Sequence, residues 1–194
     1  MSTNIKKLTL GGCCVIALSL GIANAVEAGN NYGHKYGFGT PASAADISKI
    51  DIDVMPDGRG APPGQGTYAE GKKVYAATCA ACHGADMAKP VKGTGAAPLR
   101  GGRGTLTSGK PKKTVESYWP YASTLFDYTK RSMPFNEPGS MNDNDIYAVV
   151  AYILAEGGII SKDTVMNAKA LANVKMPNRN GFISDPRPDI FLYD

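Results

Sequence analysis

The clearest helical pattern lies in the last third of the chain. Between residues 142 and 157, apolar residues recur at the spacing of one helix face, at Ile146, Val149, Val150 and Ile153. Asn142 has the side chain of a helix N-cap, and Gly157 followed by Gly158 supplies a stop. We therefore predict a helix between these caps, with its apolar stripe buried.

Weaker helical patterns occur elsewhere. We predict helices over residues 40–50, 68–77, 121–132 and 164–172, with a helical turn over 114–118. Gly71 leaves one position of the 68–77 helix without a side chain. We expect Tyr152 to pack close to it, where this helix crosses the helix that starts at Asn142. No stretch shows the alternation of a strand or the turn signature of a hairpin, so we predict an all-α fold.

Glycine and proline are abundant, at 23 and 13 of 194 residues. Their share exceeds the usual value of about 12%, which indicates many loops. The length suits one domain with extensions. We predict a signal peptide over 1–25, a loop-rich N-terminal extension over 26–66, a helical domain over 67–158 and a loop-rich C-terminal extension over 159–194.

Residues 1–25 have the parts of a secretory signal peptide. A basic start and the apolar stretch 8–22 precede a small-residue cleavage site at 23–25, and Ala28 offers a second position. The apolar stretch is shorter than the ~20 residues that a membrane helix needs. We therefore predict a soluble protein exported to the periplasm, with no membrane insertion after cleavage.

The remaining cysteines point to one kind of chemistry. Cleavage would remove Cys13 and Cys14, leaving Cys79 and Cys82 directly before His83. This CxxCH spacing lets each thiol add to one vinyl group of haem while the histidine binds the iron. A zinc site would need four ligands, and a dithiol redox motif would need a preceding strand. We predict one covalently bound haem c.

The second axial ligand must come from elsewhere in the chain. Three Met-Pro pairs begin at Met55, Met133 and Met176. We favour Met133, because the chain after His83 is then long enough to reach the opposite haem face. Met87 is too close to His83 to do so. His34 remains an alternative, and a His/His pair would lower the potential that a His/Met pair raises.

Four further residues are predicted to contact the haem: Pro98, Leu99, Trp119 and Tyr121. We expect the carbonyl of Pro98 to accept a hydrogen bond from the free ring nitrogen of His83 and so fix its orientation. Leu99 would pack against the ring. Trp119 and Tyr121 either donate to a propionate or pack as plain aromatic side chains.

Charge is unevenly distributed along the chain. The formal net charge of +4 is too small to indicate nucleic-acid binding. Between residues 87 and 115, however, there are basic residues and no acidic ones: Lys89, Lys92, Arg100, Arg103, Lys110, Lys112 and Lys113. Three interpretations stay open: a docking surface for an acidic partner, neutralisation of the haem propionates, or a solvated loop.

The runs CAACHG, GAAPL and MPF…DIYAVVAYIL resemble class I c-type cytochromes. A closer likeness includes YGFGTPASAADI, DIDVMPDGRGAPPGQGT, SYWPYASTLFDY and KMPNRNGFISDPRPD, which look like the cytochrome c subunits of sulfite dehydrogenases and of the sulfur dehydrogenase of thiosulfate oxidation. This resemblance implies a monohaem class I cytochrome c fold, thioethers at Cys79 and Cys82, and axial ligation by His83 and Met133. It also implies a molybdopterin-containing electron donor.

The chain departs from that group in two places. The sulfur-dehydrogenase cytochrome has a second haem domain, whereas one CxxCH motif occurs here, and Met55 stands where a basic residue is expected. Our hypothesis is an electron-transfer protein, not itself an enzyme, that passes single electrons from a molybdenum sulfite-oxidising dehydrogenase to another cytochrome or a terminal oxidase. The alternatives are a haem enzyme or sensor with an open sixth site and a permanently bound haem subunit.

Overall fold

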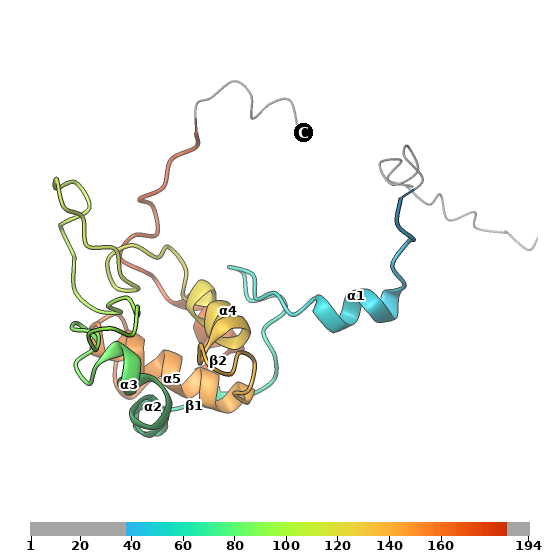
Figure 1. The fold of residues 1–194 in the computed structure, drawn as a ribbon, viewed down its shortest axis with the longest axis horizontal. Coiled ribbons are helices and arrows are strands. Elements are labelled where there is room, and N and C mark those ends of the chain that lie inside the picture. Colours follow the sequence, from blue (N-terminus) through green and yellow to red (C-terminus); the bar gives the residue numbers. More distant parts are fainter. Residues whose placement is uncertain (1–37, 186–194) are drawn as a thin grey trace, which may run out of the picture. The chain divides into compact units, whose positions relative to one another are not determined.

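Helix α5 (Asp143–Glu156) forms the centre of the core in the computed structural model, which describes residues 38–185 (Figure 1). Asn142 caps it by accepting a hydrogen bond from the backbone N–H of Asp145 at 2.9 Å, as predicted. Residues 146–155 are all buried, so the helix is covered on every side and not only along the predicted apolar stripe.

Helix α2 (Tyr68–Val74) begins where the sequence pattern placed it. Its N-cap, Thr67, accepts a hydrogen bond from the backbone N–H of Glu70 at 3.3 Å, and the Glu70 carboxylate accepts one from the Thr67 N–H at 2.8 Å. This reciprocal pair satisfies two backbone donors that a helix start otherwise leaves unpaired. The first turn of the helix is thereby fixed.

The crossing of α2 and α5 depends on a missing side chain. A Cβ at Gly71 would overlap the backbone carbonyl of Ala148 and lie 2.8 Å from the Cβ of Tyr152. The Tyr152 ring lies 5.1 Å from the ring of Tyr68 and 5.4 Å from that of Tyr75, centre to centre. The expected close approach of Gly71 and Tyr152 is therefore confirmed.

The helix that begins with α2 runs further than predicted. The sequence pattern ended it at residue 77, but the chain continues through the π-helical turn η1 (Tyr75–Cys79) into α3 (Ala80–His83). The N–H of Ala80 bonds to the carbonyl of Tyr75, five residues back, which widens the turn. The haem-attachment motif is thus held on the end of a helix that packs in the core.

Helix α4 (Ala122–Ser132) lies next to α5 and confirms the prediction for 121–132, with Tyr121 as its N-cap. Leu125 and Phe126 are buried, and the Phe126 ring lies 4.5 Å from that of Tyr147, centre to centre. The expected turn over 114–118 is also present, closed by a backbone hydrogen bond of 2.9 Å from residue 118 to residue 114.

A short ladder was missed by the sequence analysis. Strand β1 (Gln65–Gly66) pairs antiparallel with β2 (Met166–Asn167), and helix α6 (Ala168–Asn173) follows. Strands of two residues are too short to show alternation, so no pattern could have revealed them. They also explain why the predicted helix over 164–172 begins later, at Ala168.

The segment before β1 packs against the helical domain. Val54 is buried, and its N–H donates to the Asp127 carboxylate on α4 at 2.9 Å. The Tyr147 hydroxyl on α5 donates to the carbonyl of Pro62 at 2.8 Å. Further upstream, α1 (Ala44–Ile50) begins three residues after the predicted start at Pro41 and has no buried residue.

The C-terminal segment contributes to the same core. Met166, Leu171 and Met176 are buried. Beyond them, the side-chain amide of Asn178 donates to the carbonyl of Tyr118 at 2.7 Å. Within the two predicted extensions, the parts around residues 54–62 and 166–178 are therefore attached to the helical domain by buried side chains and hydrogen bonds.

Within residues 38–185, no helix has the length and apolar character needed to cross a membrane. The predicted signal peptide over 1–25 and the alternative ligand His34 lie outside the described residues.

The crossing at Gly71 leads to a first prediction. Gly71→Ala places a methyl group against the backbone of Ala148, which has no room to move, and should lower the free energy of unfolding by about 1–3 kcal/mol. Gly109→Ala is the control, because a Cβ at Gly109 meets open space. The measurement is the denaturation midpoint of both variants, and equal midpoints would contradict the role given to Gly71.

Candidate haem site

The two thiols of the CxxCH motif lie on consecutive turns of the same helical segment. Cys79 ends η1 and is partly buried, whereas Cys82 lies in α3 and is exposed, and both are free thiols. Burial raises the pKa of the Cys79 thiol to about 11, and the neighbouring Cys82 acts in the same direction. Cys79 is therefore a neutral thiol at neutral pH.

His83 is held in a single orientation by the loop that follows it. Its Nδ1 lies 2.9 Å from the backbone carbonyl of Ala97. Because a carbonyl only accepts, Nδ1 carries the proton and the lone pair is on Nε2, the nitrogen left for iron. The prediction placed this carbonyl on Pro98, which is wrong by one residue, since the carbonyls of successive residues in an extended loop point in different directions.

The backbone after His83 is also fixed. The Tyr75 hydroxyl donates to the carbonyl of Gly84 at 2.7 Å, and burial raises the pKa of this hydroxyl, so it stays a donor. Gly84 has a φ of +76°, and a Cβ there would overlap the carbonyl of Lys89. The turn that leaves the motif therefore requires glycine at this position.

The methionines differ in their surroundings. Met87 and Met176 are buried in the core, Met55 is 41% exposed, and Met141 is partly buried against the core. Met133 is the C-cap of α4, where its N–H donates to the carbonyl of Thr129 at 3.1 Å. It is partly buried and is followed by the exposed Phe135.

The other predicted contacts lie in two groups. Leu99 is partly buried against the core, in the loop that carries Ala97. The ring of Trp119 meets that of Tyr128 edge-on at 5.8 Å, and Arg179 from the C-terminal segment stacks on the Tyr121 ring at 4.2 Å. Tyr128 is 48% exposed. The haem contacts of Pro98, Leu99, Trp119 and Tyr121 stay predictions.

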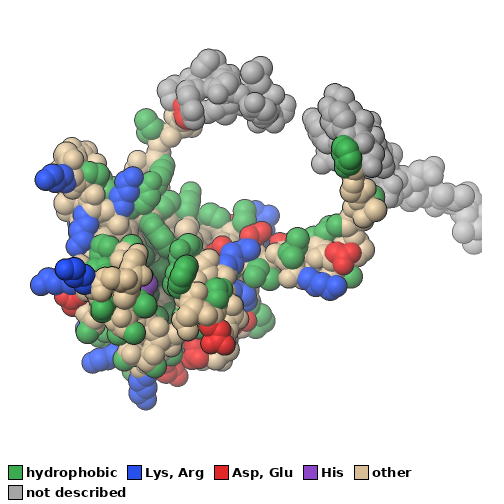
Figure 2. Space-filling model, in the orientation of Figure 1, with side chains coloured by type: hydrophobic (Ala, Val, Ile, Leu, Met, Phe, Trp, Pro, Cys, Tyr) green, Lys and Arg blue, Asp and Glu red, His purple; other side chains and the backbone are tan. Residues whose placement is uncertain are grey.

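The basic run divides into two sets. Arg100 and Arg103 form ion pairs with Glu156 and Glu116, at 3.4 and 2.8 Å. In the part of the chain that the structure describes, the five lysines of the run form no ion pair: Lys89, Lys92, Lys110, Lys112 and Lys113. Figure 2 shows basic side chains gathered on the side of the domain where the loop drawn green in Figure 1 lies.

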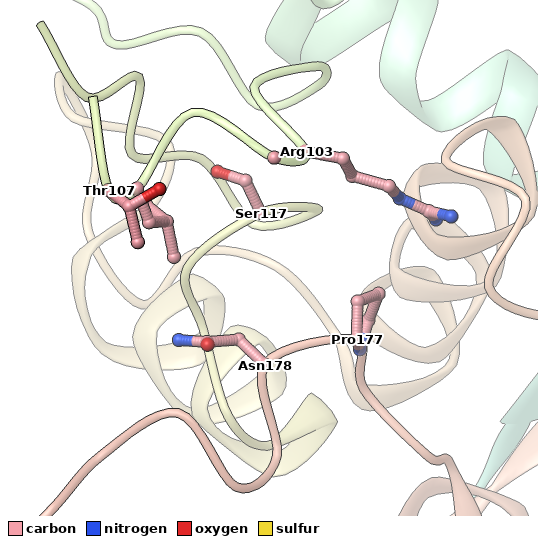
Figure 3. A pocket seen from close by; sticks show the side chains of 7 residues that line it. Arg103, Thr107, Ser117, Pro177 and Asn178 are labelled. Carbon is pink, nitrogen blue, oxygen red and sulfur yellow. The ribbon is translucent and has the colours of Figure 1, made fainter.

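Two hollows occur away from the motif. One, of about 260 Å³, lies between the basic loop and the C-terminal segment and is lined by residues that include Arg103, Thr107, Ser117 and Asn178 (Figure 3). The other, of about 670 Å³, is formed by residues 172–181. Neither is lined by the CxxCH residues, and the guanidinium of Arg103 is occupied by Glu116 and the carbonyl of Gly157.

The donor set fits haem c. Two free thiols stand three residues apart on a helix end, and the next residue offers a ring nitrogen that no hydrogen bond within residues 38–185 occupies. A helix precedes the motif, where a thioredoxin-like dithiol would need a strand. Among the described residues, no group of three His, Cys, Asp or Glu side chains is placed to hold a metal ion.

Comparisons with known proteins agree with this geometry. A family model described as Cytochrome c matches residues 68–156. A thiosulfate dehydrogenase from Stutzerimonas stutzeri is 32% identical over 93 residues, which are 47% of this chain and 28% of that protein. A chain in the crystal structure of the sulfane dehydrogenase SoxCD from Paracoccus pantotrophus is 40% identical, with a TM-score of 0.70, over 82% of this chain and 76% of that chain.

The match to the thiosulfate dehydrogenase therefore spans less than a third of that protein's length. The match to the sulfane dehydrogenase extends well outside the region of the family model. Together with the CxxCH geometry, these findings show that the chain belongs to the cytochrome c family, whose members bind haem c covalently, and is related to the cytochrome subunits of sulfur dehydrogenases.

Proposed function

We propose that this chain is a periplasmic monohaem cytochrome c that takes single electrons from a molybdenum-containing sulfite- or sulfur-oxidising dehydrogenase and passes them to another cytochrome or a terminal oxidase. The observation that carries the proposal is the likeness to the sulfane dehydrogenase structure over 82% of the chain. A likeness confined to the haem domain would be shared with cytochromes of many functions, but this one includes the extensions.

The chain's own residues prepare the site for electron transfer. Cys79 and Cys82 would hold the haem covalently, and His83 would offer Nε2 to the iron, since the Ala97 carbonyl occupies the opposite ring nitrogen. When bound, haem c supplies a one-electron couple between Fe(III) and Fe(II). The one CxxCH motif in the sequence supports a single haem.

Met133 is the proposed second axial ligand. Among the described methionines, Met87, Met166 and Met176 fill the core and Met55 is 41% exposed, whereas Met133 and Met141 are partly buried. Met133 instead follows the last turn of α4, at the start of the loop that leads to α5. A methionine sulfur at this position would favour the reduced iron and raise the reduction potential.

The free lysines are the proposed recognition surface. Arg100 and Arg103 are paired with carboxylates within the chain, so the charges that a partner meets are the five lysines of the basic run that form no ion pair with a described residue, defined here as the lysine surface. Such a surface attracts an acidic partner from a distance and speeds its association. We propose that the dehydrogenase docks on the lysine surface.

One observation favours a bound subunit over a free carrier. Helix α1 has seven residues, none of them buried, and exposes Ile47 and Ile50 by 48 and 75%, while Ile52, just after the helix, is 37% exposed. Isolated helices shorter than about 12 residues are marginal in water, so burial of these apolar side chains against a partner would stabilise the helix. We propose that its contact is an apolar groove on the same dehydrogenase.

The donor is tested by mixing the purified holo-cytochrome with candidate molybdenum dehydrogenases and following haem reduction after adding sulfite or thiosulfate. We expect rapid reduction by at least one of them, and co-elution of that pair in size-exclusion chromatography if the cytochrome is a bound subunit. A failure of all candidates with both substrates would overturn the proposed donor and leave the haem site unaffected.

Replacement of Met133 by Ala tests the axial ligand. We expect the variant to lose the low-spin six-coordinate spectrum, to bind carbon monoxide in its reduced form and to show a lower reduction potential. Met55→Ala is the matched control, because Met55 is an exposed methionine that also precedes proline. A Met133→Ala protein with an unchanged spectrum would show that another residue binds the iron.

The lysine surface is tested by charge reversal. Lys89→Glu combined with Lys92→Glu should slow reduction by the dehydrogenase about tenfold or more at low ionic strength and weaken the dependence of the rate on salt. Lys169→Glu combined with Lys175→Glu makes the same change in net charge at exposed lysines outside the surface. Equal effects of the two pairs would mean that only net charge matters.

A further inference from the structure

The carbonyl that orients His83 belongs to a loop without regular structure. Ala97 is exposed and lies between α3 and α4, in a stretch where the structure has no helix or strand. Two backbone hydrogen bonds hold the loop just beyond it, from the N–H groups of Leu99 and Arg100 to the carbonyl of Met87, at 2.8 and 3.2 Å. The side chains of the next residues determine how firmly this stretch is fixed.

Those side chains reach the C-terminal end of α5. The guanidinium of Arg100 lies 3.4 Å from the Glu156 carboxylate, and Arg103 donates to the carbonyl of Gly157. Cations are favoured at this end of a helix, where unpaired carbonyls carry partial negative charge. The loop that carries Ala97 is thus tied to the most buried helix of the core.

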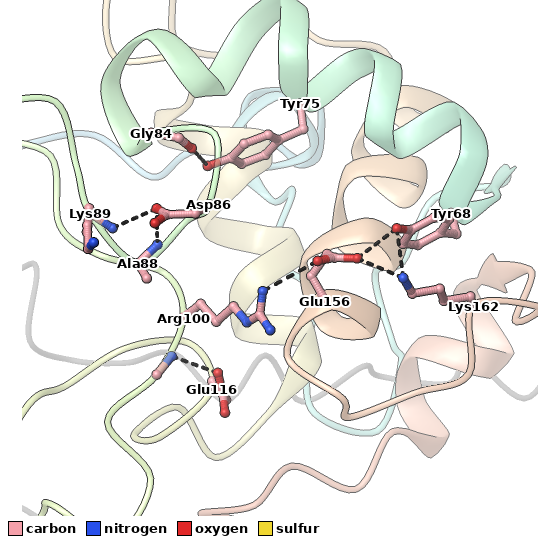
Figure 4. A network of polar contacts seen from close by, with 11 residues as sticks. Tyr68, Tyr75, Gly84, Asp86, Ala88, Lys89, Arg100, Glu116, Glu156 and Lys162 are labelled. Carbon is pink, nitrogen blue, oxygen red and sulfur yellow. Dashed lines mark hydrogen bonds and ion pairs between the residues drawn. The ribbon is translucent and has the colours of Figure 1, made fainter.

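Glu156 is itself fixed from two other sides (Figure 4). The Tyr68 hydroxyl on α2 donates to it at 2.7 Å, and the Lys162 ammonium lies 3.1 Å away. The Tyr68 hydrogen bond, followed by Lys162 and Arg100, holds the pKa of this carboxyl below its usual range. Glu156 therefore remains a charged, immobile acceptor for Arg100.

We propose that Arg100 and Glu156 are a positioning pair for His83. Their ion pair holds the loop at the place where the Ala97 carbonyl meets Nδ1, and so sets the strength of that hydrogen bond. This inference rests on the proposed role of His83 as an iron ligand. Neither residue touches His83, so both act through the loop.

The strength of the hydrogen bond from His83 Nδ1 would in turn influence the reduction potential of the haem iron. An imidazole that donates a strong hydrogen bond from Nδ1 is a more basic ligand at Nε2 and favours Fe(III). Loosening the loop weakens that bond, makes the ligand less basic and raises the potential. Gly101, held by the Glu116 carboxylate at 2.7 Å, keeps the loop folded when the pair is broken.

The test measures the reduction potential of Glu156→Gln and Arg100→Gln in the holo-protein. A simple charge effect and a positioning effect predict different directions of change in this potential. Loss of a negative charge raises a reduction potential and loss of a positive charge lowers it, so charge alone shifts the two variants in opposite directions. Loss of positioning, in contrast, raises the reduction potential of both variants. In both variants, solvent exchange of the Nδ1 proton, measured by NMR of the reduced protein labelled at histidine, should also accelerate about threefold or more.

Two further variants serve as controls. Lys162→Gln removes the other cation beside Glu156 and should leave the Nδ1 exchange rate unchanged, whereas Arg100→Lys keeps the ion pair and should restore both the potential and the exchange rate. A fall in potential for Arg100→Gln, or an unchanged Nδ1 exchange rate in it, would overturn the inference. These measurements need no electron donor, so their failure is distinct from failure of the proposed dehydrogenase partner.

Discussion

The close approach of α2 to α5 is the constraint on which the rest of the site depends. Gly71 has no side chain, so the backbone of α2 lies directly against Ala148, and Tyr68 and Tyr75 both contact the ring of Tyr152. Because η1 and α3 continue the same helix, this crossing fixes where the haem-attachment residues emerge from the core. Tyr75 then links the crossing to Gly84, directly after His83.

The parts of this arrangement that depend on local chemistry could be predicted from the sequence. Asn142 marks the start of α5 because a short polar side chain there can satisfy the first turn. Gly71 indicated a helix crossing because a bare patch on a helix permits close backbone contact. The CxxCH motif identified its cofactor because the spacing of two thiols and a histidine has few other uses.

The remaining parts depend on backbone geometry that side chains do not encode. The π-helical turn that ends at Cys79 interrupts the 3.6-residue period on which the prediction relied, so the expected helix ended too early. Any residue offers a carbonyl, so the choice of Ala97 over Pro98 as the partner of His83 is made by the path of the loop. The run of basic residues likewise gave no sign that Arg100 and Arg103 form ion pairs with carboxylates outside it.

The two extensions bear on function because they share the core of the haem domain. The family model covers residues 68–156, yet Val54, Met166, Leu171 and Met176 outside it are buried. Ordering a residue costs about 1–2 kcal/mol in backbone entropy, and an electron carrier does not need these segments to hold its haem. Helix α1 lies upstream of this anchored chain, has no buried residue and leaves Ile47 and Ile50 exposed. Ordered chain on both sides of the haem domain, together with the exposed isoleucines of α1, supports the proposed docked subunit over a carrier that diffuses alone.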